Sequence, residues 1–172
     1  DSTCDRLDND CDGIIDDDWN LDATEPNQTS DQALFLGNLG SGSNEQSVLT
    51  QSAYIFDESD IDAFYFYTVD GWTDGGFEVD LDDVPLGVDI AFAVDFIPGV
   101  DDGTGTIVPD WPNIETDWRV EDSNGIGESE SGCIGEPGLC STTGYSTGFY
   151  AVRVYSMLGS DCTVMYTITI TD

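Results

Sequence analysis

The stretch Val88-Asp89-Ile90-Ala91-Phe92-Ala93-Val94-Asp95-Phe96 decides the fold of this chain, because large apolar residues alternate along it with small or acidic ones. Successive side chains of a β-strand point to opposite faces, so the five large side chains share one face. The other face receives only alanine and aspartate. This period of two predicts a strand with one face in a hydrophobic core.

Similar alternation recurs along the chain, interrupted by turns rich in Gly, Asp and Ser. We expect strands at Ser47–Phe56, Asp62–Val69, Gly76–Leu81, Val88–Phe96, Thr116–Glu121, Gly148–Ser156 and Thr163–Thr171, with a short piece at Ala33–Leu36. No helical periodicity of useful length is present. The sequence therefore predicts an all-β fold, an antiparallel jelly-roll or Ig-like β-sandwich of about seven to eight strands.

The alternation also assigns side chains to faces. Core-facing side chains are expected at Phe77, Val79, Leu81, Tyr150, Val152, Val154, Tyr166, Ile168 and Ile170. The strand Asp62–Val69 is large on both faces, with Phe64 and Phe66 opposite Tyr65 and Tyr67. We expect it to be central, or to have its second face covered by the segment before the sandwich. Pro98–Pro112 and Asp122–Gly148 break the alternation and are expected to be long loops.

The charge of the chain is extreme. Its 172 residues contain 36 acidic residues, three arginines, no lysine and no histidine, which gives a net charge of −33. Such a surface repels phosphate backbones and anionic lipid, so we expect no nucleic-acid partner. No apolar run approaches the ~20 residues that span a bilayer, so no membrane insertion is expected. Without His or Lys the common nucleophilic triads and Schiff bases are missing, and we expect no enzyme activity.

The N-terminal stretch Asp8-Asn9-Asp10-Cys11-Asp12-Gly13-Ile14-Ile15-Asp16 has the spacing of a calcium loop. Carboxylates at every second position converge on one point only around a cation, and calcium accepts six to eight oxygen ligands. The expected ligands are Asp8, Asp10, Asp12, the carbonyl of Ile14 and Asp16, with Asp5 or Asp17 as supplements. Trp19 replaces the bidentate Glu of an EF-hand, so this is not an EF-hand. A solvated acidic tail is the alternative.

The five cysteines suggest an oxidising compartment. Cys4 and Cys11 bracket the acidic loop, and Cys133 and Cys140 bracket a six-residue segment, so local pairing of each couple is the simplest interpretation. Cys162 is then a buried thiol or an intermolecular link. Zinc binding is the rival, but neither couple has the Cys-x-x-Cys spacing.

Two resemblances follow from these motifs. Residues 4 to 16 resemble thrombospondin type 3 repeats and the Cys-Asp-rich metal-binding motif of secreted bacterial proteins. Residues 22 to 171 resemble bacterial pre-peptidase C-terminal domains. The residues that carry this second resemblance are Glu25-Pro26-Asn27-Gln28-Thr29, Asp60-Ile61-Asp62-Ala63-Phe64-Tyr65-Phe66, Val88-Asp89-Ile90, Gly148-Phe149-Tyr150-Ala151-Val152-Arg153-Val154 and Tyr166-Thr167-Ile168-Thr169-Ile170. It implies a secreted, non-catalytic sandwich that is often appended to hydrolases.

Three further features have competing interpretations. Trp111 and Trp118, near the first long loop, could stack on sugar rings, although partly buried anchors of the loop are the more frequent case. Asn27-Gln28-Thr29 is a formal glycosylation sequon within the opening motif, for which we prefer a structural role. The acidic groups around Asp60 and Asp80 are either a second calcium site or a solvated turn and sheet face.

These observations predict a calcium loop at 1–18, a linker at 19–30 and a β-sandwich at 31–172. We expect an extracellular or cell-surface protein in a saline or calcium-containing setting, with Ca²⁺ as its cofactor. The leading hypothesis is a structural or adhesive module that assembles with neighbouring subunits. The alternative is an accessory domain of a secreted hydrolase that binds an extracellular polymer or carbohydrate.

Overall fold

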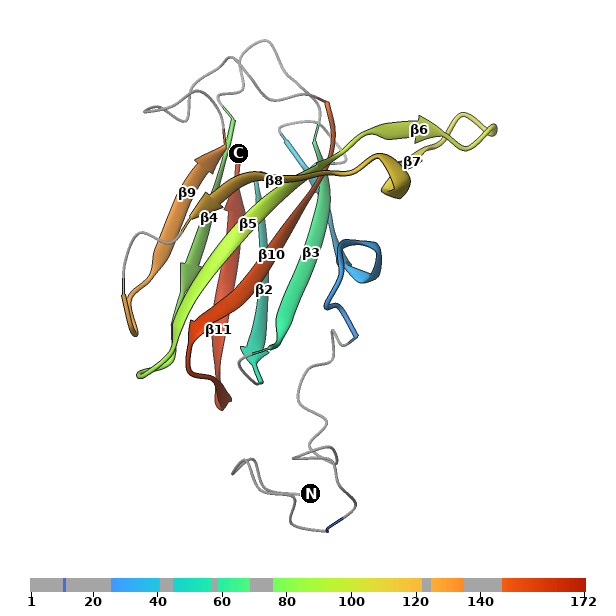
Figure 1. Ribbon diagram of the computed structural model, residues 1–172. Coiled ribbons are helices and arrows are strands. Elements are labelled where there is room, and N and C mark those ends of the chain that lie inside the picture. The colour runs from blue at the N-terminus through green and yellow to red at the C-terminus, as the bar shows by residue number, and fades with distance from the viewer. Residues whose placement is uncertain are drawn as a thin grey trace.

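Figure 1 shows a β-sandwich in a computed structural model of the chain. The structure describes residues 11, 26–40, 45–56, 59–68, 76–121, 125–134 and 147–172, and the side chains at 116–121, 133, 134 and 162 are not described. The strands in these ranges are β1 (Leu34–Leu39), β2 (Val48–Ile55), β3 (Ile61–Thr68), β4 (Phe77–Asp82), β5 (Asp89–Ile97), β6 (Gly99–Asp101), β7 (Ile107–Pro109), β8 (Glu115–Glu121), β9 (Glu130–Ile134), β10 (Gly148–Leu158) and β11 (Asp161–Thr171). Two single 3₁₀ turns, η1 (Ser30–Gln32) and η2 (Trp111–Asn113), complete the elements.

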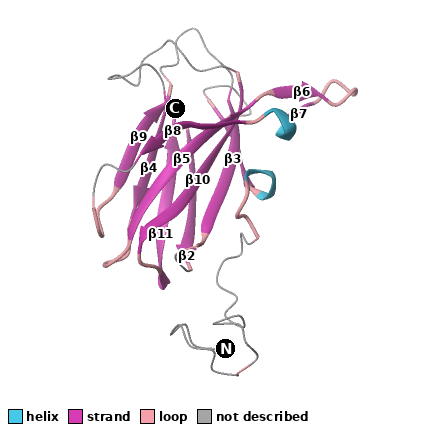
Figure 2. Cartoon of the chain, viewed as in Figure 1, coloured by secondary structure: helices cyan, strands magenta, loops and turns pink. Residues whose placement is uncertain are grey.

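Two sheets form the layers of the sandwich, as Figure 2 shows in magenta. One has five strands in the order β1-β3-β10-β5-β8, and the other has four in the order β2-β11-β4-β9. The last two strands of the chain are therefore internal to the two sheets. The hairpin β6–β7 leaves the five-stranded sheet and projects to one side (Figure 1).

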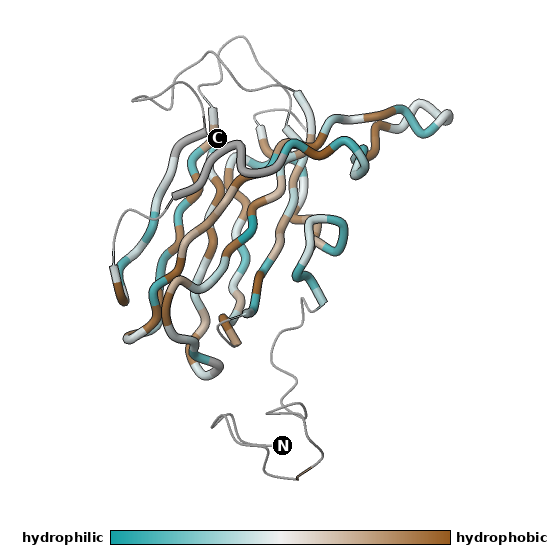
Figure 3. Tube along the Cα trace, in the orientation of Figure 1, coloured by the Kyte–Doolittle hydropathy of each residue, from teal (hydrophilic) through white to brown (hydrophobic). Residues whose placement is uncertain are grey.

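The main core lies between the two sheets. Brown segments on both layers in Figure 3 mark the apolar residues of the strands. Its buried members include Phe64, Phe66, Phe77, Val79, Leu81, Val88, Ile90, Phe92, Val94, Tyr150, Val152, Val154, Tyr166, Ile168 and Ile170. The face assignments made from the alternation are confirmed for all of these residues. Aromatic side chains of the two sheets pack against each other. The Phe66 ring of β3 and the Phe77 ring of β4 are perpendicular, with centroids 4.9 Å apart.

The eight strands expected from the sequence are all present, with ends that differ by a few residues. The second face of β3 is covered, as one of the two expectations for this strand required. The cover is partial: Trp111 of η2 packs on Tyr65, and η1, in the segment before β1, lies against β3.

Two features of the expected fold were wrong. Antiparallel pairing fails at β1, which pairs with β3 in parallel. The chain crosses to the other sheet for β2 and returns for β3, and two reversals of direction leave β1 and β3 pointing the same way. The loops also contain three unexpected strands: β6 and β7 within Pro98–Pro112, and β9 within 122–148.

No helix in the described ranges is long and apolar enough to cross a membrane.

Candidate functional site

A buried polar network fastens the segment before β1 to the sandwich. Asn27 and Asp62 have no exposed surface. The Asn27 Nδ2 donates to Asp62 Oδ1 at 3.2 Å, and the Tyr166 hydroxyl donates to Asp62 Oδ2 at 2.7 Å. The Ala63 amide donates to the Asn27 carbonyl at 3.0 Å. One carboxylate thus connects the start of the domain with a strand from each sheet. The burial of Asn27 agrees with the structural role expected for the sequon.

A second buried carboxylate, that of Asp95, holds η1 against the five-stranded sheet. Asp95 on β5 has no exposed surface and accepts hydrogen bonds from Arg153 Nε at 2.7 Å and from an Arg153 terminal nitrogen at 3.0 Å. The Ser30 hydroxyl of η1 donates to the same carboxylate at 3.1 Å. Arg153 and Asp95 thus form an ion pair, and Ser30 ties η1 to it on the outer face of the five-stranded sheet.

Aromatic side chains form a smaller cluster on that outer face. Ile97, Phe149 and Ala151 are buried there beneath Tyr65, Tyr67, Trp111 and Ile114. The Trp111 ring meets the Tyr65 ring edge-on, with centroids 5.3 Å apart and planes at 76°. Burial raises the pKa of the Tyr65 hydroxyl above its usual value, which agrees with its place under the tryptophan.

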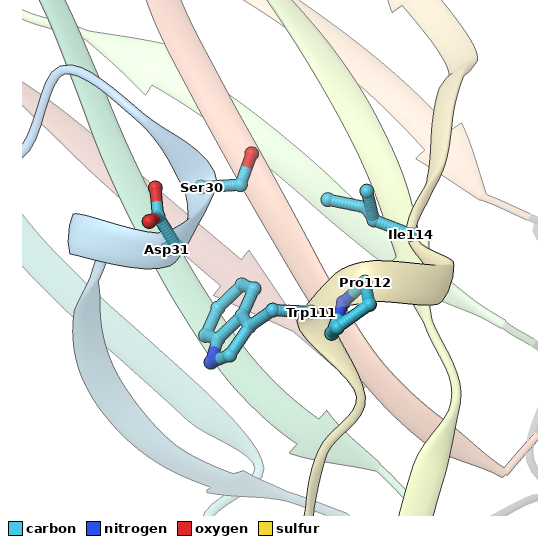
Figure 4. Close-up of a pocket in the computed structure, with 5 residues that line it drawn as sticks. All are labelled: Ser30, Asp31, Trp111, Pro112 and Ile114. Atoms are coloured by element: carbon cyan, nitrogen blue, oxygen red, sulfur yellow. The ribbon is translucent and has the colours of Figure 1, made fainter.

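A groove of about 360 Å³ lies between η1 and η2 over this cluster. The groove is lined by Ser30 and Asp31 from η1 on one side and by Trp111, Pro112 and Ile114 on the other, as Figure 4 shows. Trp111 is half-buried, Asp31 is exposed, and the walls combine one carboxylate with three apolar side chains. The groove therefore offers an aromatic face beside a negative charge.

Trp111 is a partly buried anchor that packs η2 against Tyr65, and it also lines the groove. Stacking of its ring on a sugar stays a prediction. Trp118 lies on β8, and its side chain is outside the description. Sequence reasoning missed Ser30, Asp31, Pro112 and Ile114. The Trp-Pro pair at the start of η2 was a local turn signal, but nothing in the sequence predicted that η1 and η2 are neighbours.

The predicted calcium ligands Asp5, Asp8, Asp10, Asp12, Ile14, Asp16 and Asp17 lie outside the described residues. The same holds for Cys4 and Cys140, and the Cys133 and Cys162 side chains are not described. Cys11 alone is described in the acidic loop; it is exposed, with a φ of 63°. The two predicted disulfides therefore stay predictions.

Four other acidic residues have structural roles, namely Asp60, Asp62, Asp101 and Asp102. Asp60 accepts a hydrogen bond from the Phe56 amide at 2.7 Å, and Asp62 belongs to the buried network. Asp101 and Asp102 cap the turn of the β6–β7 hairpin by accepting hydrogen bonds from the Gly103 and Thr104 amides at 2.7 and 2.8 Å. The described residues contain no group of three or more acidic, cysteine or histidine side chains that could hold a metal ion.

The class of protein that these observations define is an all-β sandwich with a small groove on one outer face. Neither a protein-family model nor a curated protein sequence matches the chain. Among solved structures, the chain is similar to the periplasmic g-type lysozyme inhibitor PliG of Aeromonas hydrophila. The identity is 13%, the TM-score is 0.34, and the match covers 81% of this chain and 97% of the inhibitor.

Proposed function

We propose that the protein is a non-catalytic, secreted, calcium-binding structural or adhesive module. An ion held by Asp8, Asp10, Asp12, the Ile14 carbonyl and Asp16 stiffens the joint at the N-terminal side of the sandwich and supports contacts between subunits of an extracellular assembly. The resemblances to thrombospondin type 3 repeats and to jelly-roll-like pre-peptidase C-terminal domains support this proposal. They also favour a bacterial cell surface as its location.

The observation that carries the proposal is the anchoring of Asn27. Its side chain is fully buried against Asp62, and its carbonyl accepts from the Ala63 amide. A calcium loop can transmit rigidity to a domain only if the chain on the far side of the joint is itself fixed. Asn27, eleven positions after Asp16, supplies such a fixed point.

The charge of the chain gives independent support. A net charge of −33 destabilises the compact state by self-repulsion, and bound divalent ions relieve it. The absence of His and Lys from the sequence supports the non-catalytic part of the proposal.

A calorimetric titration tests calcium binding. Asp10→Ala with Asp12→Ala removes two expected ligands and two charges, whereas Glu78→Gln with Asp82→Asn removes only two charges, from the exposed face of β4. We expect calcium to bind the parent and the β4 variant and to bind the loop variant at least ten-fold more weakly. Equal affinity in all three proteins would mean diffuse attraction to the acidic surface. Light scattering in millimolar calcium tests assembly, and a strict monomer would refute it.

The second candidate is an accessory domain that binds an extracellular polymer or carbohydrate, and the groove beside Trp111 favours it. Retention on insoluble polysaccharide or collagen, compared among the parent, Trp111→Ala and Trp118→Ala, tests this function. Unchanged retention in both variants would locate polymer binding elsewhere.

A further inference from the structure

We propose that the groove between η1 and η2 binds an arginine or lysine side chain of a basic polypeptide. The inference rests on the second candidate function, polymer binding beside Trp111, and names the chemistry of the polymer. It does not depend on calcium.

Aromatic packing fixes the Trp111 ring in a position where it can bind a cation. Its ring is fixed by the edge-on contact with Tyr65 at 5.3 Å, and Tyr65 is in turn in contact with Phe149, 6.2 Å away between centroids. An indole face is the strongest aromatic partner for a guanidinium or ammonium group. Because the ring is already immobilised by packing, little side-chain entropy is lost when a ligand stacks on it.

Asp31 supplies the opposite charge across the groove. Its carboxylate is exposed and is oriented by the Thr29 hydroxyl, which donates to Asp31 Oδ1 at 2.7 Å. The nearby Arg153 guanidinium does not cancel this charge, because it makes a two-pronged contact with the buried Asp95. The groove therefore keeps a net negative charge beside the indole.

The remaining lining residues favour a long aliphatic stem with a charged head over a sugar. Pro112 and Ile114 offer apolar surface, on which the methylene stem of Lys or Arg packs well. A sugar needs several hydrogen-bonding partners for its hydroxyl groups. Of the two polar side chains in the lining, Ser30 already donates its hydroxyl to Asp95. The net charge of −33 adds long-range attraction for a basic partner.

The test uses the indole N–H resonance of Trp111, assigned by its loss in Trp111→Phe. The full chain is titrated with an acetylated, amidated Gly-Arg-Gly-Arg-Gly peptide, with the lysine analogue, with glucosamine trimer and with cellotriose. Asp31→Asn is compared with Glu78→Gln, which removes one charge from the exposed face of the other sheet. Thermal melting of each variant checks that the sandwich is intact.

We expect the two basic peptides to shift the Trp111 resonance saturably. Asp31→Asn should weaken binding several-fold more than Glu78→Gln does. Trp111→Leu lacks the reporter resonance and is titrated by calorimetry instead; it should weaken binding about three- to thirty-fold. Equal weakening by Asp31→Asn and Glu78→Gln would overturn the inference in favour of non-specific attraction. A response to cellotriose or glucosamine trimer alone would also overturn it, while leaving polymer binding in place. No response of the Trp111 resonance to any ligand would reject the inference and would locate any polymer binding away from the groove.

Discussion

At the scale of single residues, two buried carboxylates fasten the start of the domain to its sheets. Asp62 and Asp95 have no exposed surface, and each joins the segment around η1 to the strands. A buried charge is tolerated only with compensating partners, so each network is sensitive to the loss of one member.

Arg153→Met should lower the free energy of unfolding by about 3–5 kcal/mol, because Asp95 would stay buried without its guanidinium. Urea denaturation measures the change. The double variant Arg153→Met, Asp95→Leu is the control and should lose less, since no uncompensated charge remains. A loss below about 1 kcal/mol in the single variant would show that the pair is not needed for stability.

Asp80 should make stability depend on pH. Burial, followed by repulsion from Glu78 and Asp82, raises the pKa of Asp80 above 3.8. The folded state then binds this proton more tightly than the unfolded state, so stability is lost as pH rises from 3.8 through the raised pKa. Asp80→Asn should raise the melting temperature at pH 7 and have no effect well below pH 3.8. A gain of equal size at both pH values would contradict this cause.

At the scale of elements, the turns and 3₁₀ segments depend on backbone conformations and close approaches that the alternating pattern of the strands does not predict. Gly159, in the β10–β11 turn, has a φ of 75°, and a Cβ there would lie 2.6 Å from the Gly87 carbonyl oxygen. Gly105, in the β6–β7 turn, has a similar φ of 87° with open space around it.

Gly159→Ala should therefore destabilise the protein more than Gly105→Ala does. Both variants meet the cost of a positive φ, about 1–2 kcal/mol, and only the first also displaces a backbone atom. Chemical denaturation of the two variants measures the difference. Equal losses of unfolding free energy in the two variants would mean that the β10–β11 turn shifts away from Gly87 at little energetic cost.

The sequence predicted those elements whose side chains alternate in size. The pattern at Phe77, Val79 and Leu81 is enough to place β4, because burial of one sheet face requires it. In β9 the residue facing the core between Glu130 and Ile134 is Gly132, so no alternation marks the strand. Alternation also says nothing about the direction of a partner strand, which is why the parallel β1–β3 pair was missed. The groove forms because η1 and η2, about eighty residues apart in the chain, lie on either side of it, and no local pattern encodes that proximity.

At the scale of the whole molecule, repulsion among the negative charges should lower the stability of the fold. The net charge of −33 predicts that added NaCl raises the melting temperature between low ionic strength and about 0.5 M, where the screening length falls to a few ångströms. Scanning calorimetry measures the change. Sucrose at matched osmolality is the control, because it favours compact states without screening charge. A melting temperature that ignores salt would show that charge repulsion does not limit the fold.

The order of strands has a consequence for how the molecule is made. β10 lies between β3 and β5, and β11 lies between β2 and β4. The two strands that are synthesised last therefore occupy internal positions, one in each sheet. Until residues 148–172 leave the ribosome, β3 and β5 have no strand to bridge them, and Asp62 lacks its hydroxyl donor Tyr166. Folding therefore waits for synthesis of these strands and then requires closure of very long chain segments, which is slow. During that interval neither sheet is complete, and a chain without its completed sandwich is the form that a narrow export channel could thread.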